Sequence, residues 1–233
     1  MAAIDKRNLN VPHMSKISRR NLLKAGAVVA IGLAGVSVAG CTSSSPAPGE
    51  MTQYEGKQLT PASGFETQTI SSVPQIDSGS YSLVISGLVN QQKTYAYADL
   101  TNMPSVQRVV TLNCVEGWDA TALWTGVSLA ALLANSGVMS TAKTVIFQSQ
   151  DGDSTSFTID DVNGNDFMIA LNINGIPLTA NRGYPTRLVA DTKWGYKWIK
   201  WITSIELSDQ DYTGYWEKNG YSNVGNLNQS FQS

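Results

Sequence analysis

The chain has 233 residues, of which 42% are hydrophobic and 15% charged, and its formal net charge is −2. This composition is typical of a globular protein with one or two domains. The only histidine, His13, falls in the first 40 residues. The rest of the chain therefore lacks the residue needed for Ser-His-Asp or Cys-His catalysis, for the common zinc sites and for His-ligated haem.

The first 40 residues are typical of an export signal. The basic stretch SRRNLLK at 18–24 precedes about 16 apolar and small residues, which is short for a membrane span. Arg19 and Arg20 match the twin-arginine type of signal, and VAGC at 38–41 resembles a lipobox. We therefore expect residues 1–40 to be a signal peptide and Cys41 to carry a lipid. The alternative is a plain N-terminal membrane anchor in which Cys41 is incidental.

A Ser-, Pro- and Gly-rich run follows Cys41, and we expect residues 41–64 to form a flexible tether. Six of the 16 basic residues but only one of the 18 acidic residues precede Cys41. The chain after the signal therefore has a net charge of about −7. An acidic domain lacks the basic surface that nucleic-acid binding requires.

The following residues alternate between short strand patterns and short helical patterns. Alternating or apolar runs predict strands, and the spacing of Leu129, Leu132 and Leu133 predicts a helix that ends near Gly137. The expected strands are 81–86, 106–114, 143–152 with 154–159 as its hairpin partner, 167–175, 186–190 and 199–207, and the expected helices lie within 95–104 and 126–137. This pattern predicts an α+β domain at 65–220, rich in mixed β-sheet with a few short helices, and a polar tail at 221–233.

Cys114 stands at the end of the expected strand 106–114, directly before Val-Glu-Gly-Trp. If Cys41 is lipidated, Cys114 is the only thiol, and an exported compartment is oxidising. One reading is a buried structural cysteine, since cysteine is among the most buried residue types. The other is a thiolate ligand to a cofactor that brings its own reactivity.

Five basic residues cluster in an otherwise acidic domain: Arg182, Arg187, Lys193, Lys197 and Lys200. Such a local excess favours an anionic ligand, because Arg and Lys donate hydrogen bonds to phosphate. Trp194, Tyr196 and Trp198 alternate among them, and their rings could pack against a flat heterocycle. The alternative is a strand pair whose basic residues reach solvent while the aromatic rings fill the core.

The two stretches CVEGWDATALWTGVSLAALL and GYPTRLVADTKWGYKWIKWITSIEL, taken together, resemble the molybdopterin-binding oxidoreductase domain of the sulfite oxidase family. That family includes the catalytic subunit of a periplasmic methionine-sulfoxide reductase. The resemblance covers roughly residues 75–220, and GYWEKNGY at 214–221 resembles the tail of its short members. It implies the sulfite-oxidase-type fold and a molybdenum–molybdopterin cofactor.

The resemblance also implies roles for individual residues. Cys114 would be the catalytic ligand to molybdenum, beside the dithiolene of one pterin. The cofactor-binding residues would be Ser149, Arg182, Arg187, Trp198, Ile199 and Lys200. Arg182 stands where relatives often have His or Asn, which leaves its role open.

The implied activity is oxygen-atom transfer to or from a small sulfur-containing or similar oxo substrate. Sulfite would need a positive pocket, to which Arg182 or Arg108 could contribute, whereas methionine sulfoxide would need a wider and less charged one. Electrons would pass to a separate partner, either a haem protein or a quinone-linked membrane protein. We expect an exported monomer on the periplasmic or cell-surface side, anchored to the membrane through Cys41. The alternative is a lipid-anchored binding or assembly module with the same fold and no molybdenum.

Overall fold

A computed structural model describes residues 44–233. The signal peptide expected at 1–40 and the lipidation expected at Cys41 lie outside the described residues and stay predictions. No helix within 44–233 is long and apolar enough to cross a membrane.

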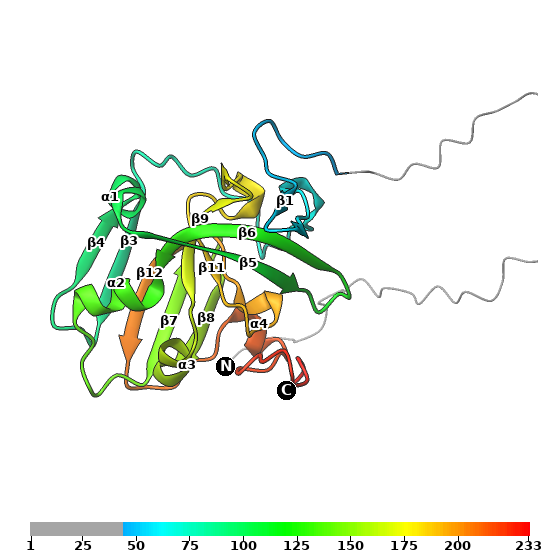
Figure 1. The fold of residues 1–233 in the computed structure, drawn as a ribbon. Helices are drawn as coiled ribbons and strands as arrows, with labels where there is room; N and C mark the ends of the chain where they lie inside the picture. Colours follow the sequence, from blue (N-terminus) through cyan, green and yellow to red (C-terminus); the bar gives the residue numbers. More distant parts are fainter. Residues whose placement is uncertain (1–43) are drawn as a thin grey trace, which may run out of the picture. The chain divides into compact units, whose positions relative to one another are not determined.

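The first of two five-stranded sheets carries the long β5–β6 hairpin (Figure 1). Its strand order is β10-β9-β6-β5. Strand β11 pairs with residues 168–170 of β9, on the edge where β10 pairs with residues 172–173. All pairings of this sheet are antiparallel. The strands are β5 (Ser105–Asn113), β6 (Asp119–Ser128), β9 (Met168–Ile173), β10 (Ile176–Pro177) and β11 (Arg187–Val189).

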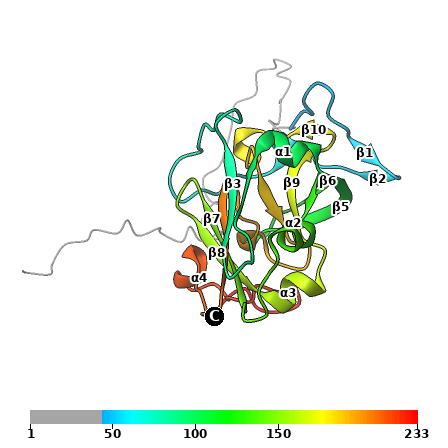
Figure 2. The same ribbon diagram turned by 90° about the vertical axis from the view of Figure 1, so that its left-hand side faces the viewer.

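The second sheet has the order β4-β3-β12-β7-β8, and only the β3–β12 pair is parallel. The expected hairpin of β7 and β8 is confirmed, with Asp151 and Gly152 in its turn. Figure 2 shows this sheet facing the first one. Its strands are β3 (Ser82–Gly87), β4 (Lys93–Ala96), β7 (Thr144–Ser149), β8 (Ser154–Thr158) and β12 (Ile202–Ser208).

Four short α-helices and three 3₁₀ turns complete the described part of the chain. Helix α2 starts where the Ser128 hydroxyl accepts a hydrogen bond from Ala131 N, and it ends at Gly137, whose φ of 66° places it in the left-handed region. The short elements are β1 (Gln53–Tyr54), β2 (Lys57–Gln58), η1 (Ala62–Gly64), α1 (Tyr97–Asn102), α2 (Leu129–Ser136), α3 (Ile159–Gly164), η2 (Ala180–Arg182), η3 (Gly195–Lys197) and α4 (Tyr215–Lys218). The predicted α+β class, rich in sheet with few helices, is confirmed.

The core lies between the two sheets and includes large aromatic side chains from both. Trp124 of β6 is fully buried, with its ring edge-on to Trp198 at 6.0 Å and to Phe65 at 5.8 Å. Such edge-to-face pairs add to the free energy gained by burying the rings. Phe65 and Trp198 of this aromatic group also line the functional pocket described below.

Strand β6 is the main element that the sequence pattern did not predict. The expected helix at 126–137 begins only at Leu129, because Gly126 to Ser128 still belong to β6. A Cβ atom at Gly126 would lie 2.0 Å from Ile169 O on β9, so the strand pair needs glycine there. The expected strand at 199–207 likewise begins only at Ile202, since Trp201 has a φ of +54°.

The chain before residue 65 is more ordered than the expected tether at 41–64. The Glu50 carboxylate accepts hydrogen bonds from Ala62 N and from Asn174 Nδ2. Thr60 N donates to Thr121 O on β6, and Leu59 is buried. From Glu50 onwards this segment therefore packs on the first sheet. The sequence pattern missed this because Asn174 and Thr121, the partners on the first sheet, lie more than 60 residues from Glu50 and Thr60.

Candidate active site

The turn between β5 and β6 holds Cys114. Cys114 N donates to Trp118 O at 2.9 Å, and Gly117 N donates back to Cys114 O at 3.2 Å. Gly117 has a φ of 89°, which glycine adopts without strain. The Leu-rich helix α2 does not lie beside this cysteine. The helix instead follows the far end of ten-residue β6, about 30 Å along the strand, so the hairpin alone supports Cys114.

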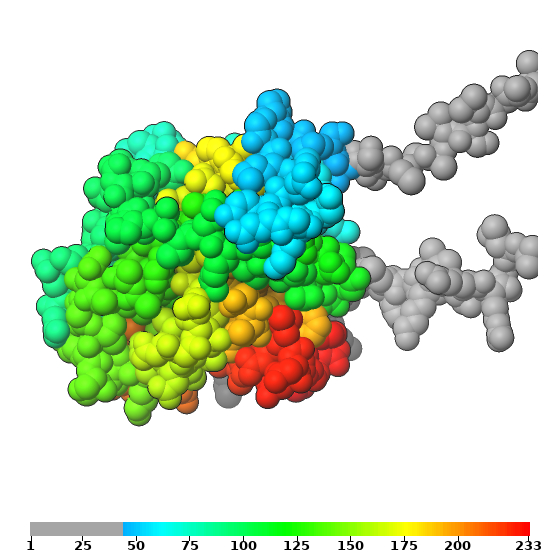
Figure 3. Space-filling model, viewed as in Figure 1, coloured from blue at the N-terminus to red at the C-terminus, as the bar shows by residue number. Residues whose placement is uncertain are grey.

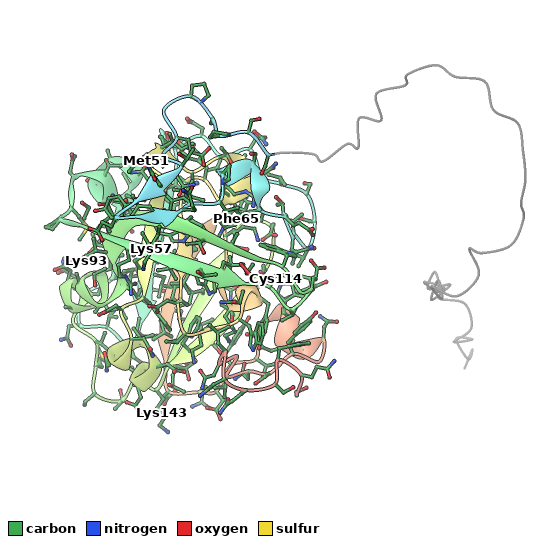
Figure 4. The ribbon with its side chains drawn as sticks, turned by 45° about the vertical axis from the view of Figure 1, so that its right-hand side comes forward. Met51, Lys57, Phe65, Lys93, Cys114 and Lys143 are labelled. Carbon is green, nitrogen blue, oxygen red and sulfur yellow. The ribbon has the colours of Figure 1, made fainter. Side chains whose placement is uncertain are left out.

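Cys114 is half-buried and faces a pocket at the end of the hairpin, with Phe65 close by (Figure 4). Five of the residues predicted for the site line this one pocket: Cys114, Arg182, Arg187, Trp198 and Lys200. They come from segments up to 86 residues apart in the chain. The fold therefore joins the cysteine and the basic stretch, as the resemblance implied.

Arg187 is the most deeply buried cation of the pocket, at 3% exposure. Its two terminal nitrogens donate to the carbonyls of Arg182 and Trp198, while its buried Nε has no partner. The guanidinium carbon lies 4.9 Å from the centre of the Trp124 ring. Burial, followed by the charge of Arg182, lowers the pKa of Arg187 to about 9. A buried cation without a counter-ion is costly, and an anion in the pocket would offset that cost.

Gly183 directly follows Arg182 and has a left-handed conformation (φ 102°), and the side chains of Arg187 and Lys200 lie against it. Burial lowers the pKa of Arg182 to about 10. Burial, then the charge of Arg187, lowers the pKa of Lys200 to about 8. Within residues 44–233, none of the three forms a salt bridge. We call these three residues the pocket cations.

Asp153, at the β7–β8 turn, is the buried acid of this region. Burial, then the charge of Asp151, raises the pKa of Asp153 to about 7. A carboxyl group that is half protonated near neutral pH only partly balances the pocket cations. The pocket therefore keeps a positive end.

The cysteine end of the pocket differs in charge. Burial raises the pKa of the Cys114 thiol; a backbone hydrogen bond at Glu116 lowers it, and the charges of Glu116 and Glu66 raise it. Trp118 and Phe65 pack edge-on at 6.4 Å beside these groups. This end is therefore acidic and aromatic.

The two remaining predicted site residues do not line the pocket. Ser149 ends β7, and its hydroxyl donates to the Asp151 carboxylate and to Asp153 O, so it contacts a lining residue instead. Ile199 is buried, and its carbonyl accepts from Leu188 N. Arg108, considered as part of an anion pocket, instead pairs with Asp191 at 3.0 Å outside the pocket.

Two of the five basic residues in the 182–200 stretch have structural roles, which corrects the expectation of one shared anion site. Lys197 Nζ lies 2.6 Å from the Glu217 carboxylate, and Lys193 Nζ lies 2.8 Å from that of Asp161. Both lysine side chains are fully buried. We call Lys193 and Lys197 the core lysines.

Sequence reasoning missed the walls that both ends of the chain supply. Phe65, Glu66 and Gln68 precede the two stretches that carry the family resemblance, and Trp216 and Tyr221 follow them. In Figure 3 the blue N-terminal residues and the red C-terminal residues lie on either side of the green β5–β6 hairpin. The only sequence signal was the stretch GYWEKNGY, which contains both Trp216 and Tyr221.

The donors in the pocket suit a molybdenum–pterin cofactor. No group of three or more His, Cys, Asp or Glu residues in the described part of the chain could hold a metal ion. A metal here would therefore have one protein sulfur, from Cys114, and donors that a cofactor brings. The unpaired Arg187 Nε and the other pocket cations would bind the cofactor's phosphate.

Comparison with protein families gives one match that covers most of this domain. The oxidoreductase molybdopterin binding domain matches residues 70–216. The chain is 30% identical over 158 residues to the uncharacterized oxidoreductase YuiH of Bacillus subtilis, a match covering 66% of this chain and 80% of YuiH. It is 33% identical over 153 residues to a putative protein-methionine-sulfoxide reductase subunit, YedZ1, of Azospira oryzae, a match covering 66% of this chain.

Larger relatives share the same domain. Human mitochondrial sulfite oxidase is 26% identical over 193 residues, a match covering 70% of this chain and 35% of the human protein. The crystal structure of the sulfane dehydrogenase SoxCD from Paracoccus pantotrophus superimposes with a TM-score of 0.63 at 26% identity, covering 65% of this chain and 44% of that one. The chain spans 58% of the length of YedZ1.

These matches confirm the resemblance, the sulfite-oxidase-type fold and the cofactor that it implies. The chain belongs to the family of oxidoreductases with a molybdopterin-binding domain of the sulfite oxidase type.

Proposed function

We propose that this protein is an exported molybdenum-cofactor oxidoreductase that transfers an oxygen atom to or from a small sulfur-containing or similar oxo substrate. One observation carries the proposal. Three cations without carboxylate partners and one half-buried thiol line the same pocket. A soft sulfur donor beside an anion site is the combination that a molybdenum–pterin phosphate requires.

Each pocket residue then has a definite task. Cys114 Sγ would bind molybdenum, and Arg182, Arg187 and Lys200 would hold the phosphate of the pterin. The indole N–H of Trp198 donates a hydrogen bond to Lys193 O at 3.0 Å, so the orientation of this ring is set before any ligand binds. When bound, the cofactor supplies oxygen-atom transfer and two-electron redox chemistry, while the protein positions it and sets the local charge.

Electrons would pass to or from a separate partner, either a haem protein or a quinone-linked membrane protein. After Cys41 the chain has one cysteine and no histidine, so residues 42–233 lack the histidine of a His-ligated haem and the cysteine cluster of an iron–sulfur site. One relative bears the name of a reductase subunit, which agrees with a divided electron path. We place the protein outside the cytoplasm, held on the membrane by a lipid at Cys41, on the strength of Arg19-Arg20 and VAGC. We also propose that it is a monomer.

The direct test is the cofactor content of the full-length protein. The chain is purified from a host that makes the molybdenum cofactor, and molybdenum and pterin are quantified by mass spectrometry. We expect about one of each per chain. Cys114→Ser is expected to change the molybdenum EPR signal and to lower metal retention. A correctly folded, metal-free wild-type protein would reject the enzyme and favour a lipid-anchored binding or assembly module.

A further inference from the structure

The cavity beside Cys114 is small for the cofactor that the family implies. Its volume is about 100 Å³, whereas pockets that hold drug-sized ligands measure about 300–1,000 Å³. A molybdenum–pterin cofactor is at least as large as such a ligand. One wall of the pocket must therefore move to admit it, and local opening occurs where a segment is held least firmly.

The walls of the pocket differ in how their backbone is held. The β5–β6 turn, the β7–β8 turn, residues 182–200 and residues 216–221 all contain hydrogen bonds between backbone groups. The remaining wall comes from the segment that starts at Phe65. Within the part of the chain that the structure describes, residues 65–76 belong to no helix or strand and form no hydrogen bond between backbone groups. This wall is therefore the one that opens most easily.

Burial leads to the same wall, in which we call residues 66–72 the pocket strap. Phe65 before the strap is buried in the core, and Tyr81 beyond it is buried with its hydroxyl donating to Ile202 O at 2.6 Å. No residue from 66 to 80 is buried. Buried apolar area is the main source of local stability. The strap therefore has two fixed ends and a middle that can open without disturbing the core.

Polar side chains from the other walls hold the strap closed. Their contacts join the strap to three separate parts of the pocket. The contacts are Arg182 Nη1 to Glu66 O at 3.2 Å, Arg182 Nη2 to the Thr67 hydroxyl, Gln68 Nε2 to Glu116 Oε2 at 2.8 Å, and the Thr69 hydroxyl to Asp151 Oδ2 at 2.9 Å. Each contact of this kind contributes a modest net free energy, so the strap can reopen.

Asp151 makes the most contacts among these residues. One carboxylate oxygen accepts from the Thr69 hydroxyl and from Ile70 N at 3.4 Å. The other accepts from the Ser149 hydroxyl at 2.5 Å and from Asp153 N at 3.2 Å. All four partners act as donors, so both oxygens are needed as acceptors, and an amide would turn its NH₂ group towards two of them. Asp151 thus joins the strap to Ser149, a predicted cofactor-binding residue.

We propose that the pocket strap opens to admit the molybdenum–pterin cofactor and that Asp151 then locks it closed. This inference rests on the proposed function, since it gives the cofactor of the same pocket its route of entry. Opening breaks side-chain contacts and leaves both sheets and the turn that holds Cys114 intact. Loss of the cofactor requires the same opening. The strap therefore controls how fast the cofactor enters and leaves, and not how tightly it is bound.

The first experiment measures opening of the strap without any cofactor. The metal-free full-length chain is treated with thermolysin under native conditions, and cleavage within 66–76 is followed by mass spectrometry. Since the protease cuts only the open form, the cleavage rate reports the open population. We expect the strap to be cut before any other site in residues 66–233, and Thr69→Val to raise the rate about three- to tenfold, because one hydrogen bond is lost.

Thr101→Val is the matched control, because the Thr101 hydroxyl donates to Ala98 O on α1 and Thr101 does not line the pocket. This variant should be cut at the wild-type rate. First cleavage in another wall of the pocket, or equal rates in Thr69→Val and the wild type, would overturn the proposal.

The second experiment measures loading. The metal-free chain is mixed with isolated molybdenum cofactor, and uptake is followed by the fluorescence of Trp118, Trp198 and Trp216, which line the pocket, and by molybdenum content after gel filtration. Thr69→Val should raise the rates of uptake and loss by the same factor, about three- to tenfold, and leave the affinity unchanged. Asp151→Asn, a second variant, should also take up the cofactor faster than the wild type.

Arg187→Met distinguishes a strap residue from a binding residue, because it should raise the rate of loss and leave the rate of uptake unchanged. Wild-type uptake rates in both Thr69→Val and Asp151→Asn would overturn the proposal and leave the proposed function standing. A folded wild-type chain that takes up no cofactor would reject the proposed function, while the proteolysis would still decide whether the strap is the wall that opens.

Discussion

The pocket cations and the core lysines come from the same 19 residues and have opposite electrostatic surroundings. Lys193 and Lys197 each contact a carboxylate and further acceptors, such as Ser156 O and Asn223 O around Lys197 Nζ. Arg187 is equally buried and has only two backbone carbonyls. Burial alone therefore does not show what a cation does. The presence or absence of a carboxylate distinguishes a charge that holds the fold together from one available to a ligand.

The largest expected effect comes from breaking a core lysine pair. Lys197→Met leaves the Glu217 carboxylate buried without its cation, so the free energy of unfolding should fall by about 3–5 kcal/mol. Urea unfolding of the metal-free protein measures this. Arg108→Met is the control, because its pair with Asp191 is partly exposed and should contribute about 1 kcal/mol or less. Equal losses for both variants would contradict the assignment of Lys197 to the core.

The reverse result is expected for Arg187→Met. Removing an unpaired buried cation should leave the stability of the metal-free protein unchanged or raise it. Cofactor retention should weaken by about 1.5–3 kcal/mol, or roughly ten- to a hundredfold, because a charge-assisted hydrogen bond is lost. Molybdenum content after gel filtration measures the second effect. A loss of stability as large as that of Lys197→Met would remove the distinction between the two groups.

The smallest effect concerns pH and Lys200. Burial holds the pKa of Lys200 at about 8 in the folded chain, below its ordinary 10.5. Between these values the unfolded chain binds more protons than the folded one, so the stability of the metal-free protein should rise with pH across this window. In Lys200→Met the rise in stability with pH should be about 1 kcal/mol smaller than in the wild type. The difference is small because Lys200 is partly exposed and solvent screens its charge. Melting temperatures of the two proteins from pH 7 to 10.5 test the difference, and parallel curves would contradict it.

The local sequence pattern was enough to predict several elements of the fold and the family. The hairpin at Asp151-Gly152 and the cap at Gly137 depend on neighbours within a few residues, and the structure has both where the pattern placed them. The motifs around Cys114 and Arg187 sufficed to indicate the family, because each is continuous in the chain.

Tertiary structure alone decided which charges are free. Lys197 looks like Lys200 in the sequence, and only the approach of Glu217 from α4 makes it structural. Glu66 and Gln68 lie outside the matched family domain, yet they reach the Cys114 turn because Arg182 and Glu116 bind them. Strand β6 was overlooked because its pairing with β9 depends on residues 40 to 49 positions away. The role of a buried charge or of a strand edge depends on the partner that folding places beside it. The sequence pattern does not show which distant residues will come into contact.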